Sequence, residues 1–280
     1  MVKLAIVGDI HGHWSNADTA WFGAADYDAV CVVGDLAGLR WSATLQMARA
    51  LSALAVPTLL VPGNHDATHP AQLLAEMVGR PTYGDVLASV QRRRAAALED
   101  AIAPHTIAAY SAHPIGHVTV IGGRPHSMGG PSLSFPGHLA AAWGVSSIQE
   151  SAAKLCALVD AAPTDYLVFV AHNGPSGLGG RRSDIWGCDF RRDEGDWGDR
   201  DLAMAIDHAR ATGRRVLAVC AGHMHRRLRG GGERAWKVER AGTVYANAAV
   251  VPRIWSGARH HLDLRIDGSQ VTIEDRWVGQ

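Results

Sequence analysis

The chain has 280 residues, of which 47% are hydrophobic and 19% charged, a composition typical of a folded globular protein and not of a disordered one. Lys and Arg together number 27, as do Asp and Glu, and this balance argues against a broad nucleic-acid-binding surface or a basic membrane face. The length fits one large domain or two small ones. We expect a single domain over residues 1–280 that needs no disulfides.

We expect neither a targeting segment nor a membrane-spanning segment, and therefore a cytoplasmic protein. The apolar run that ends at Val7 is too short for the core of a signal peptide. No later run approaches the ~18–20 apolar residues that cross a bilayer. Cys31 and Cys220 lie in apolar, strand-like runs, so we expect buried free thiols there rather than disulfides.

The first part of the chain alternates between short apolar runs and helical patterns. The runs at residues 2–7, 29–33 and 58–61 are rich in β-branched residues and stop at Gly or Pro, which is typical of buried parallel strands. Between the last two runs, apolar residues recur every three or four positions from Trp41 to Leu51 and predict an amphipathic helix. This order predicts the βαβ units of an α/β fold.

The same alternation continues past the middle of the chain. Ser147 and Glu150 have the spacing of a capping box at the start of a helix, and a strand is predicted next at residues 166–171. Apolar residues at helical spacing over 202–209 predict another helix, and the run at 216–221 predicts the strand after it.

Towards the C-terminus the periodicity changes from helical to alternating. Residues 262–266 and 271–273 alternate on either side of an Asp-Gly turn and predict a hairpin. Residues 236–240 and 243–246 predict a second hairpin in the same way. Antiparallel strands are therefore expected to follow the parallel units.

Two stretches carry no regular pattern. Residues 122–138 are rich in Gly, Pro and Ser, and residues 174–198 contain Gly, Arg and Asp throughout, together with Trp186 and Trp197. Loops longer than ~12–15 residues in a compact domain are usually functional or disordered, and aromatic side chains make disorder the weaker interpretation. We expect both stretches to be loop insertions beside an active site.

Five strand-like runs end in a small residue followed by side chains that can ligate a metal or transfer a proton. They are Gly8-Asp9-Ile10-His11, Gly34-Asp35, Gly63-Asn64-His65-Asp66, Ala171-His172-Asn173 and Gly222-His223-Met224-His225. Because the carboxyl ends of strands in an open α/β sheet meet at one crevice, we expect these side chains to lie together. Buried carboxylates and imidazoles need partners, and divalent cations provide them.

A pair of cations would also define the class of substrate. A carboxylate such as Asp35 can bridge two ions ~3.5–4 Å apart, the spacing used for in-line phosphoryl displacement. Mixed oxygen and nitrogen ligands suit Mn, Fe or Zn better than Ca or Mg. Once two carboxylates and a hydroxide are counted, a positive charge remains, so we expect a phosphoester that is attacked by the metal-bound hydroxide.

The ordered set of motifs resembles the calcineurin-like metallophosphoesterase superfamily, whose pattern is D-x-H, G-D, G-N-H-D/E, a lone His and G-H-x-H. The resemblance covers roughly residues 2–250 and implies a four-layer α-β-β-α sandwich of two mixed sheets flanked by helices. The segment from His172 to Ser176 is similar to an uncharacterised cyanobacterial and plastid-type branch. The motif at Asp35 lacks the G-D-x-x-D-R-G form of the Ser/Thr protein phosphatases.

The resemblance also implies a role for each motif residue. The implied ligands are Asp9, His11 and His225 for the first metal, Asp35 as the bridge, and Asn64, His172 and His223 for the second metal. His65 would act beside the leaving group as a general acid or charge stabiliser, and Asp66 would orient it. The cofactors would be two divalent ions, with Mn²⁺ favoured and Fe or Zn as alternatives.

Other polar residues have weaker support. His13, Arg181 and Arg182 are candidates for contacts with the substrate, although the acidic residues interleaved with the arginines favour a solvated, salt-bridged loop. The remaining histidines lack a motif and are expected at ordinary surface or core positions. They are His69, His105, His113, His117, His126, His138, His208, His260 and His261.

Together these residues predict a dinuclear-metal phosphoesterase acting on a monoester or diester of a small molecule or nucleotide. A nuclease of the same superfamily is an alternative that the neutral charge and the lack of a basic stripe disfavour. A Ser/Thr-type protein phosphatase is disfavoured by the missing D-R-G motif, and a non-catalytic metal-binding scaffold by the complete ligand set. The sequence defines no oligomeric state.

Overall fold

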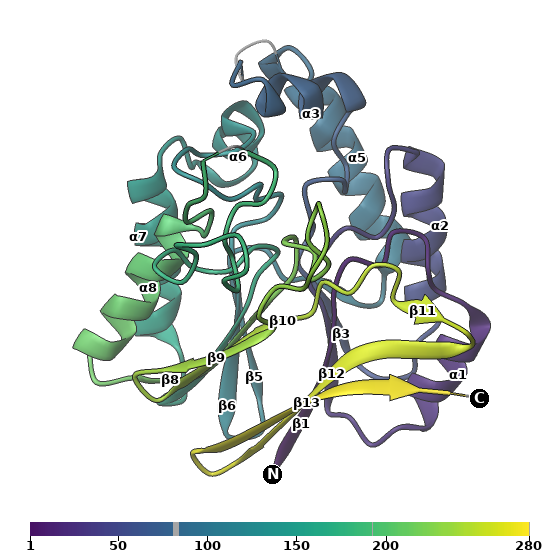
Figure 1. Ribbon diagram of the computed structural model, residues 1–280, viewed down its shortest axis with the longest axis vertical. Coiled ribbons are helices and arrows are strands. Elements are labelled where there is room, and N and C mark those ends of the chain that lie inside the picture. Colours follow the sequence, from purple (N-terminus) through teal and green to yellow (C-terminus); the bar gives the residue numbers. More distant parts are fainter. Residues whose placement is uncertain (81–83, 192, 280) are drawn as a thin grey trace.

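The computed structural model describes residues 1–80, 84–191 and 193–279 as two β-sheets with helices on their outer faces (Figure 1). Helices α7 and α8 flank one sheet, and α1 and α2 flank the other. The helices are α1 Asn16–Ala24, α2 Trp41–Ser52, α3 Pro70–Met77, α5 Ala88–Ile102, α6 Pro136–Trp143, α7 Ile148–Ala161 and α8 Arg200–Ala211.

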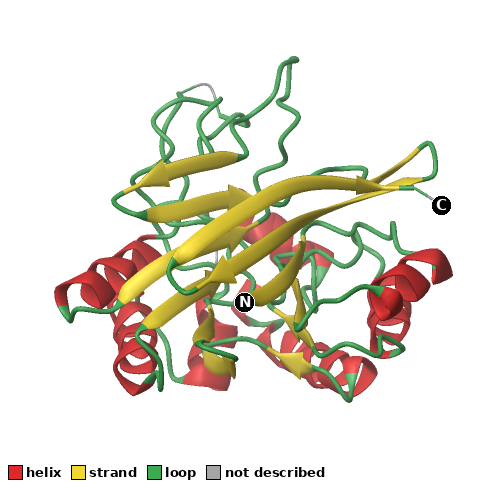
Figure 2. Cartoon of the chain, turned by 90° about the horizontal axis from the view of Figure 1, so that it is seen from below, coloured by secondary structure: helices red, strands yellow, loops and turns green. Residues whose placement is uncertain are grey.

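The first sheet combines the N-terminal strands with the last hairpin of the chain. Its order is β11-β12-β1-β2-β3-β4, and β13 also pairs with β12. Strands β1 to β4 are parallel, whereas β12 runs antiparallel to β1 with Leu264 opposite Leu4. The strands are β1 Val2–Val7, β2 Ala29–Val32, β3 Thr58–Leu60, β4 Thr106–Ile107, β11 Ile254–Trp255, β12 Ala258–Asp267 and β13 Gln270–Val278. In Figure 2 the C-terminus lies at the end of this long hairpin.

The second sheet has the order β5-β6-β7-β8-β10-β9. Its inner strands, β6, β7, β8 and β10, are parallel, and the edge strands β5 and β9 are antiparallel to their neighbours. The strands are β5 Ser111–Ile115, β6 Val118–Gly122, β7 Tyr166–Val170, β8 Arg215–Ala221, β9 Lys237–Arg240 and β10 Thr243–Asn247. Both sheets are therefore mixed, as predicted.

The burial pattern of the strands explains the four layers. In β1, Leu4 and Ile6 pack in the apolar cluster between the two sheets, whereas Ala5 and Val7 face the other way and pack in the cluster that includes Leu51 of α2. Strands buried on both faces are the near-continuous apolar runs seen in the sequence. The second sheet packs on α6, α7 and α8 in the same way. The predicted α-β-β-α sandwich is confirmed.

The start of α7 differs in detail from the predicted capping box. The Ser147 side chain accepts a hydrogen bond from the Glu150 amide at 3.1 Å, as expected. The Glu150 carboxylate, however, accepts the amide of Ser146 at 2.6 Å rather than that of Ser147. At the start of α1 the Asp18 carboxylate accepts both the amide and the hydroxyl of Ser15 at 2.9 Å.

Elements with weak apolar periodicity are harder to predict from the sequence. Helix α5 buries only part of one face, through Gln91, Leu98 and Ile102, and β5 contains Pro114. Both predicted hairpins are confirmed as β9–β10 and β12–β13, and β10 additionally pairs in parallel with β8. The prediction of buried free thiols at Cys31 and Cys220 is also confirmed.

The carboxyl ends of the parallel strands from both sheets meet at one edge of the molecule. Nδ1 of His172, after β7, donates to the carbonyl of Val33, after β2, at 2.7 Å, and the amide of His223, after β8, donates to Oδ2 of Asp9, after β1, at 3.0 Å. This edge carries all five motifs. In the part of the chain that the structure describes, no helix has both the length and the apolar character to cross a membrane.

We expect Leu264→Ala to lower the free energy of unfolding by about 2–5 kcal/mol, because it empties a fully buried position between the sheets. Urea denaturation measures the change. Thr272→Ala, at an exposed position on neighbouring β13, is the control and should change it by less than about 0.5 kcal/mol. Equal effects of the two substitutions would contradict the position of β12 in the core.

Candidate metal centre

Three of the predicted ligands come together beyond the ends of β1 and β8. Donor atoms of Asp9, His11 and His225 all lie within 4.8 Å of one another. Nε2 of His225 is 3.4 Å from Oδ1 of Asp9 and 3.2 Å from Nε2 of His11. Asp9 is fully buried; its Oδ2 accepts the amide of His223 at 3.0 Å, while its Oδ1 has no hydrogen-bond partner among the described residues.

A second group consists of Asp35, His172 and His223, again with donor atoms within 4.8 Å of one another. Nδ1 of His172 donates to the Val33 carbonyl at 2.7 Å, which leaves the lone pair on Nε2. That nitrogen is 2.9 Å from Oδ1 of Asn64. Burial acts to lower the pKa of His172, but the charges of Asp35 and Asp9 outweigh it and raise that pKa, so Nε2 can carry a proton that Oδ1 of Asn64 accepts.

The Asp35 carboxylate lies between the two groups. Its Oδ2 is 3.8 Å from Nε2 of His11, and its Oδ1 is 3.6 Å from Nε2 of His172. The ring of His65 stands beside this junction, with its centroid 5.7 Å from that of His11. The seven residues expected to ligate metals, and the expected general acid, are thus gathered at one edge.

The backbone of the site adopts conformations that L-residues rarely adopt. The φ angles of Asp9, His11, Asp35 and His223 are 47°, 44°, 52° and 66°. Such strain persists only where the surrounding structure enforces it, and it concentrates at functional sites. Gly63 is required for a close approach, because a Cβ there would lie 2.7 Å from Cε1 of His172 and would overlap Oδ1 of Asp35.

Asp66 does not hold the ring of His65. The Asp66 carboxylate accepts the amides of Gly63 at 2.8 Å and of Leu36 at 2.9 Å. Among the described residues, Nδ1 of His65 has no hydrogen-bond partner, and the His65 amide donates to Oδ1 of Asp35 at 2.9 Å. Asp66 therefore joins the loops after β2 and β3, instead of orienting the imidazole of His65 as expected from the sequence.

Burial and neighbouring charges shift the proton equilibria of these groups. Burial raises the pKa of Asp66 to about 7, and the charge of Asp35 adds to this effect. Burial also acts to raise the pKa of Asp35, but the charges of His172 and His65 outweigh it and hold that pKa well below its usual range. Burial lowers the pKa of His223 to about 3, so its imidazole is neutral near pH 7 and carries a lone pair.

The segment between β6 and α6 and the segment between β7 and α8 support His223 through a backbone carbonyl that belongs to no motif. The Met128 carbonyl is 3.2 Å from Nε2 of His223 and accepts Nε1 of Trp197 at 3.0 Å. The carbonyl of Trp197 in turn accepts the side-chain amide of Asn173 at 2.9 Å. The sequence indicated that both segments lie beside the site. It could not identify the carbonyl of Met128 as an acceptor, because every residue has a backbone carbonyl.

A buried ion cluster holds the loop after β6 against the start of α8. The Arg124 guanidinium lies 2.9 Å from the carboxylate of Asp199 and 2.8 Å from that of Asp201. Ser127 donates to Asp199 at 2.6 Å, and Ser151 donates to Asp201. Because a buried charge is tolerated only when it is paired, the cluster holds residues 122–138 against the start of α8.

The residues expected to contact the substrate are exposed. The His13 carbonyl accepts Nη1 of Arg253 at 2.9 Å, while its side chain is open to solvent. Arg181 is also exposed, and the guanidinium of Arg182 pairs with Glu194 at 2.7 Å. Substrate contact by His13 and Arg181 stays a prediction, and the pairing of Arg182 supports the salt-bridged alternative.

The family model described as calcineurin-like phosphoesterase matches residues 2–227. A dimetal phosphatase from Danio rerio has a TM-score of 0.58 at 11% identity, covering 99% of this chain and 97% of that one. An archaeal phosphodiesterase scores 0.42 at 13% identity, covering 98% and 100%. A metallophosphoesterase from Sphaerobacter thermophilus scores 0.36 at 13% identity, covering 98% and 87%. No curated protein sequence matches the chain.

We expect Gly63→Ala to weaken Mn²⁺ binding by about 10–100-fold, because the added methyl displaces Asp35 and His172. Equilibrium dialysis with Mn²⁺ measures the affinity. Gly38→Ala is the matched control, since a Cβ at Gly38 meets nothing within 4 Å. If both variants bound Mn²⁺ like the parent chain, the close packing at Gly63 would be irrelevant to the donor groups.

Proposed function

Because this chain belongs to the calcineurin-like phosphoesterase family, we propose that it uses two divalent ions to hydrolyse a phosphomonoester or phosphodiester of a small molecule or nucleotide. The family predicted from the ordered motifs is confirmed. The observation that carries the proposal is the pair of adjoining donor groups, with the carboxylate of Asp35 between them.

The chemistry of the donor set fits divalent cations. Carboxylate, amide and imidazole ligands in one site suit Mn²⁺, with Fe and Zn as alternatives. The buried Oδ1 of Asp9 lacks a hydrogen-bond partner among the described residues, and a cation would compensate it. A cation would also take the place of the proton that Nε2 of His172 shares with Oδ1 of Asn64.

We assign Asp9, His11 and His225 to one ion, Asn64, His172 and His223 to the other, and Asp35 to both. Bound there, the ions would supply positive charge to the phosphate oxygens and lower the pKa of a water molecule. The chain itself orients two of these ligands. Hydrogen bonds to the carbonyls of Val33 and Met128 set the ring tautomers of His172 and His223 so that the lone pairs face the site.

His65 is the proposed proton donor to the leaving oxygen. Its ring lies beside that of His11, and its backbone amide donates a hydrogen bond to Oδ1 of Asp35. The backbone therefore positions this imidazole relative to the donor groups. Asp66 contributes indirectly, because it fixes the loops that carry Asp35 and His65.

We expect Asp35→Asn and His65→Ala each to lower the hydrolysis rate in Mn²⁺ by at least about 100-fold. Asp35→Asn removes the charge shared by the donor groups, and His65→Ala removes the proton donor. The assay uses p-nitrophenyl phosphate and bis-p-nitrophenyl phosphate, and the ratio of the two rates distinguishes monoester from diester specificity. His117→Gln, in the turn between β5 and β6, is the control. Full activity in both site variants would refute the assignment.

We expect chelation with EDTA to abolish hydrolysis and added Mn²⁺ to restore it, because the donor groups alone supply no activated water. In Asp9→Asn, half-maximal restoration should need at least about tenfold more Mn²⁺, since a neutral amide binds a cation more weakly than a carboxylate. The measurement is a Mn²⁺ titration of the initial rate. Activity that persists in EDTA would contradict the metal-dependent reaction.

A further inference from the structure

The ring of His225 is held differently from the rings of His172 and His223. Those two rings lie against the backbone carbonyls of other loops, whereas among the described residues the ring of His225 forms no hydrogen bond to a backbone carbonyl. Its close neighbours belong to its own donor group, and its side chain is 44% exposed. The position of this imidazole therefore depends on the backbone that carries it.

Two buried side chains hold that backbone. Nε of Arg234 donates to the carbonyl of His225 at 3.2 Å, and Nδ2 of Asn247 donates to the carbonyl of Met224 at 2.7 Å. Arg234 is 3% exposed, and Asn247 is fully buried. The two carbonyls belong to the peptide groups on either side of the Cα of His225. Their hydrogen bonds therefore fix the direction in which the His225 side chain leaves the backbone.

Arg234 also binds the loop between β7 and α8. Its Nη1 donates to the carbonyl of Arg182 at 2.7 Å, to that of Asp184 at 3.1 Å, and to that of Gly187. A guanidinium presents its N–H groups as a planar fork, so one side chain can bind acceptors in two separate segments. Arg234 thus joins this loop to the turn that contains His225.

The charge of Arg234 indicates that its geometry matters beyond stability. The guanidinium is paired with Asp189, whose Oδ1 lies 3.3 Å from Nη2. For stability alone, a well-packed apolar side chain often serves as well as a buried ion pair. An apolar side chain could not donate to the carbonyls of the loop and of His225, so the guanidinium adds a fixed relation between these two segments.

We propose that Arg234 is a positioning residue, which acts through the carbonyl of His225 to set its imidazole for the ion shared with Asp9 and His11. This inference rests on the proposed assignment of His225 to that ion. Residues that orient the ligands of a metal typically change its affinity by about 10–100-fold. The loss of Arg234 should therefore lower the affinity of the chain for one ion.

The test is equilibrium dialysis of the full-length chain with Mn²⁺, which measures the number of bound ions and the affinity for each. We expect Arg234→Met to weaken the binding of one ion by about 10–100-fold and to leave the other within about threefold. Arg214→Met is the matched control and should bind both ions as the parent chain does. Arg214 also donates to two backbone carbonyls and pairs with a carboxylate, but it precedes β8, whereas His225 follows it.

A double-mutant cycle separates positioning from a general structural role. His225→Ala removes the ligand itself, so Arg234→Met should weaken Mn²⁺ binding no further when it is added to His225→Ala. Losses that add up in the double variant would overturn the inference, as would unchanged affinity for both ions in Arg234→Met. A parent chain that binds fewer than two ions would overturn the proposed dinuclear function, and this inference with it.

Arg234→Lys keeps the buried charge and tests the proposal even if Arg234→Met fails to fold. The donors of an ammonium group radiate from one nitrogen and cannot reproduce the fork of the guanidinium, so we expect one ion to bind about tenfold more weakly. Urea denaturation shows which variants are folded. Parent-like affinity for both ions in folded Arg234→Lys would contradict the proposed role of the fork.

Discussion

Two carboxylates, Asp9 and Asp35, are buried where the sheets meet, and among the described residues neither is paired with a lysine or arginine. A buried charge must be compensated, and here imidazoles from four separate loops surround the two carboxylates. To compensate the charges, the loops must come very close together. The backbone is left-handed at both aspartates, and Gly63 has no side chain that would block the approach of Asp35 and His172. The hydrogen bonds of the Asp66 carboxylate and the Met128 carbonyl beside His223 help to hold that arrangement in place.

The strands and the motif residues could be predicted because their signals are local. Each β-branched run is short, ends at a small residue and is followed directly by polar side chains. The residues that gather at the edge of the sheet could therefore be predicted from the sequence. The contacts of Asp66, the carbonyl of Met128 and the cluster around Arg124 depend instead on which loops meet in space. Loops of the same amino-acid composition could make many other contacts, so residue spacing in the sequence does not identify the contacts that form.

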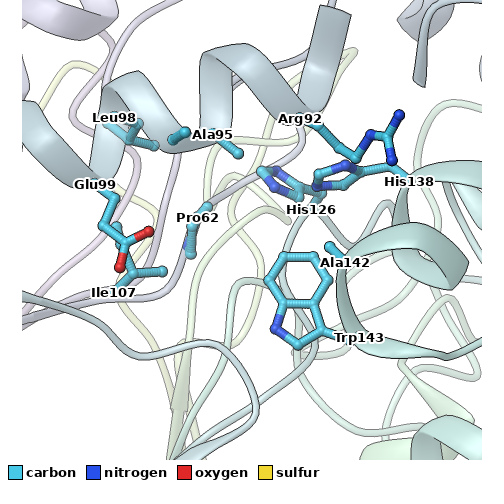
Figure 3. Close-up of a pocket in the computed structure, with 11 residues that line it drawn as sticks. Pro62, Arg92, Ala95, Leu98, Glu99, Ile107, His126, His138, Ala142 and Trp143 are labelled. Carbon is cyan, nitrogen blue, oxygen red and sulfur yellow. The ribbon is translucent and has the colours of Figure 1, made fainter. Parts of the chain in front are cut away.

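Motif reasoning also has a limit at histidines that belong to no motif. His126 and His138 were expected at ordinary surface or core positions, and both are indeed buried. Nδ1 of His126 donates to the Gly63 carbonyl at 2.9 Å, whereas its Nε2 and both ring nitrogens of the adjacent His138 (Figure 3) lack partners among the described residues. The contacts of buried histidines such as these depend on how distant segments pack, and the order of residues does not record them.

Strand β12 lies beside β1, so the first strand of the chain obtains its second neighbour only from residues near the other end. During synthesis, β1 can pair with β2 early, but its opposite edge stays open until β12 leaves the ribosome. An unpaired apolar edge is a template for association with other chains, and contacts between distant parts of a sequence form slowly. Asp9 and His11 follow β1 directly, so β12 helps to hold two of the donor residues although it contributes no donor itself.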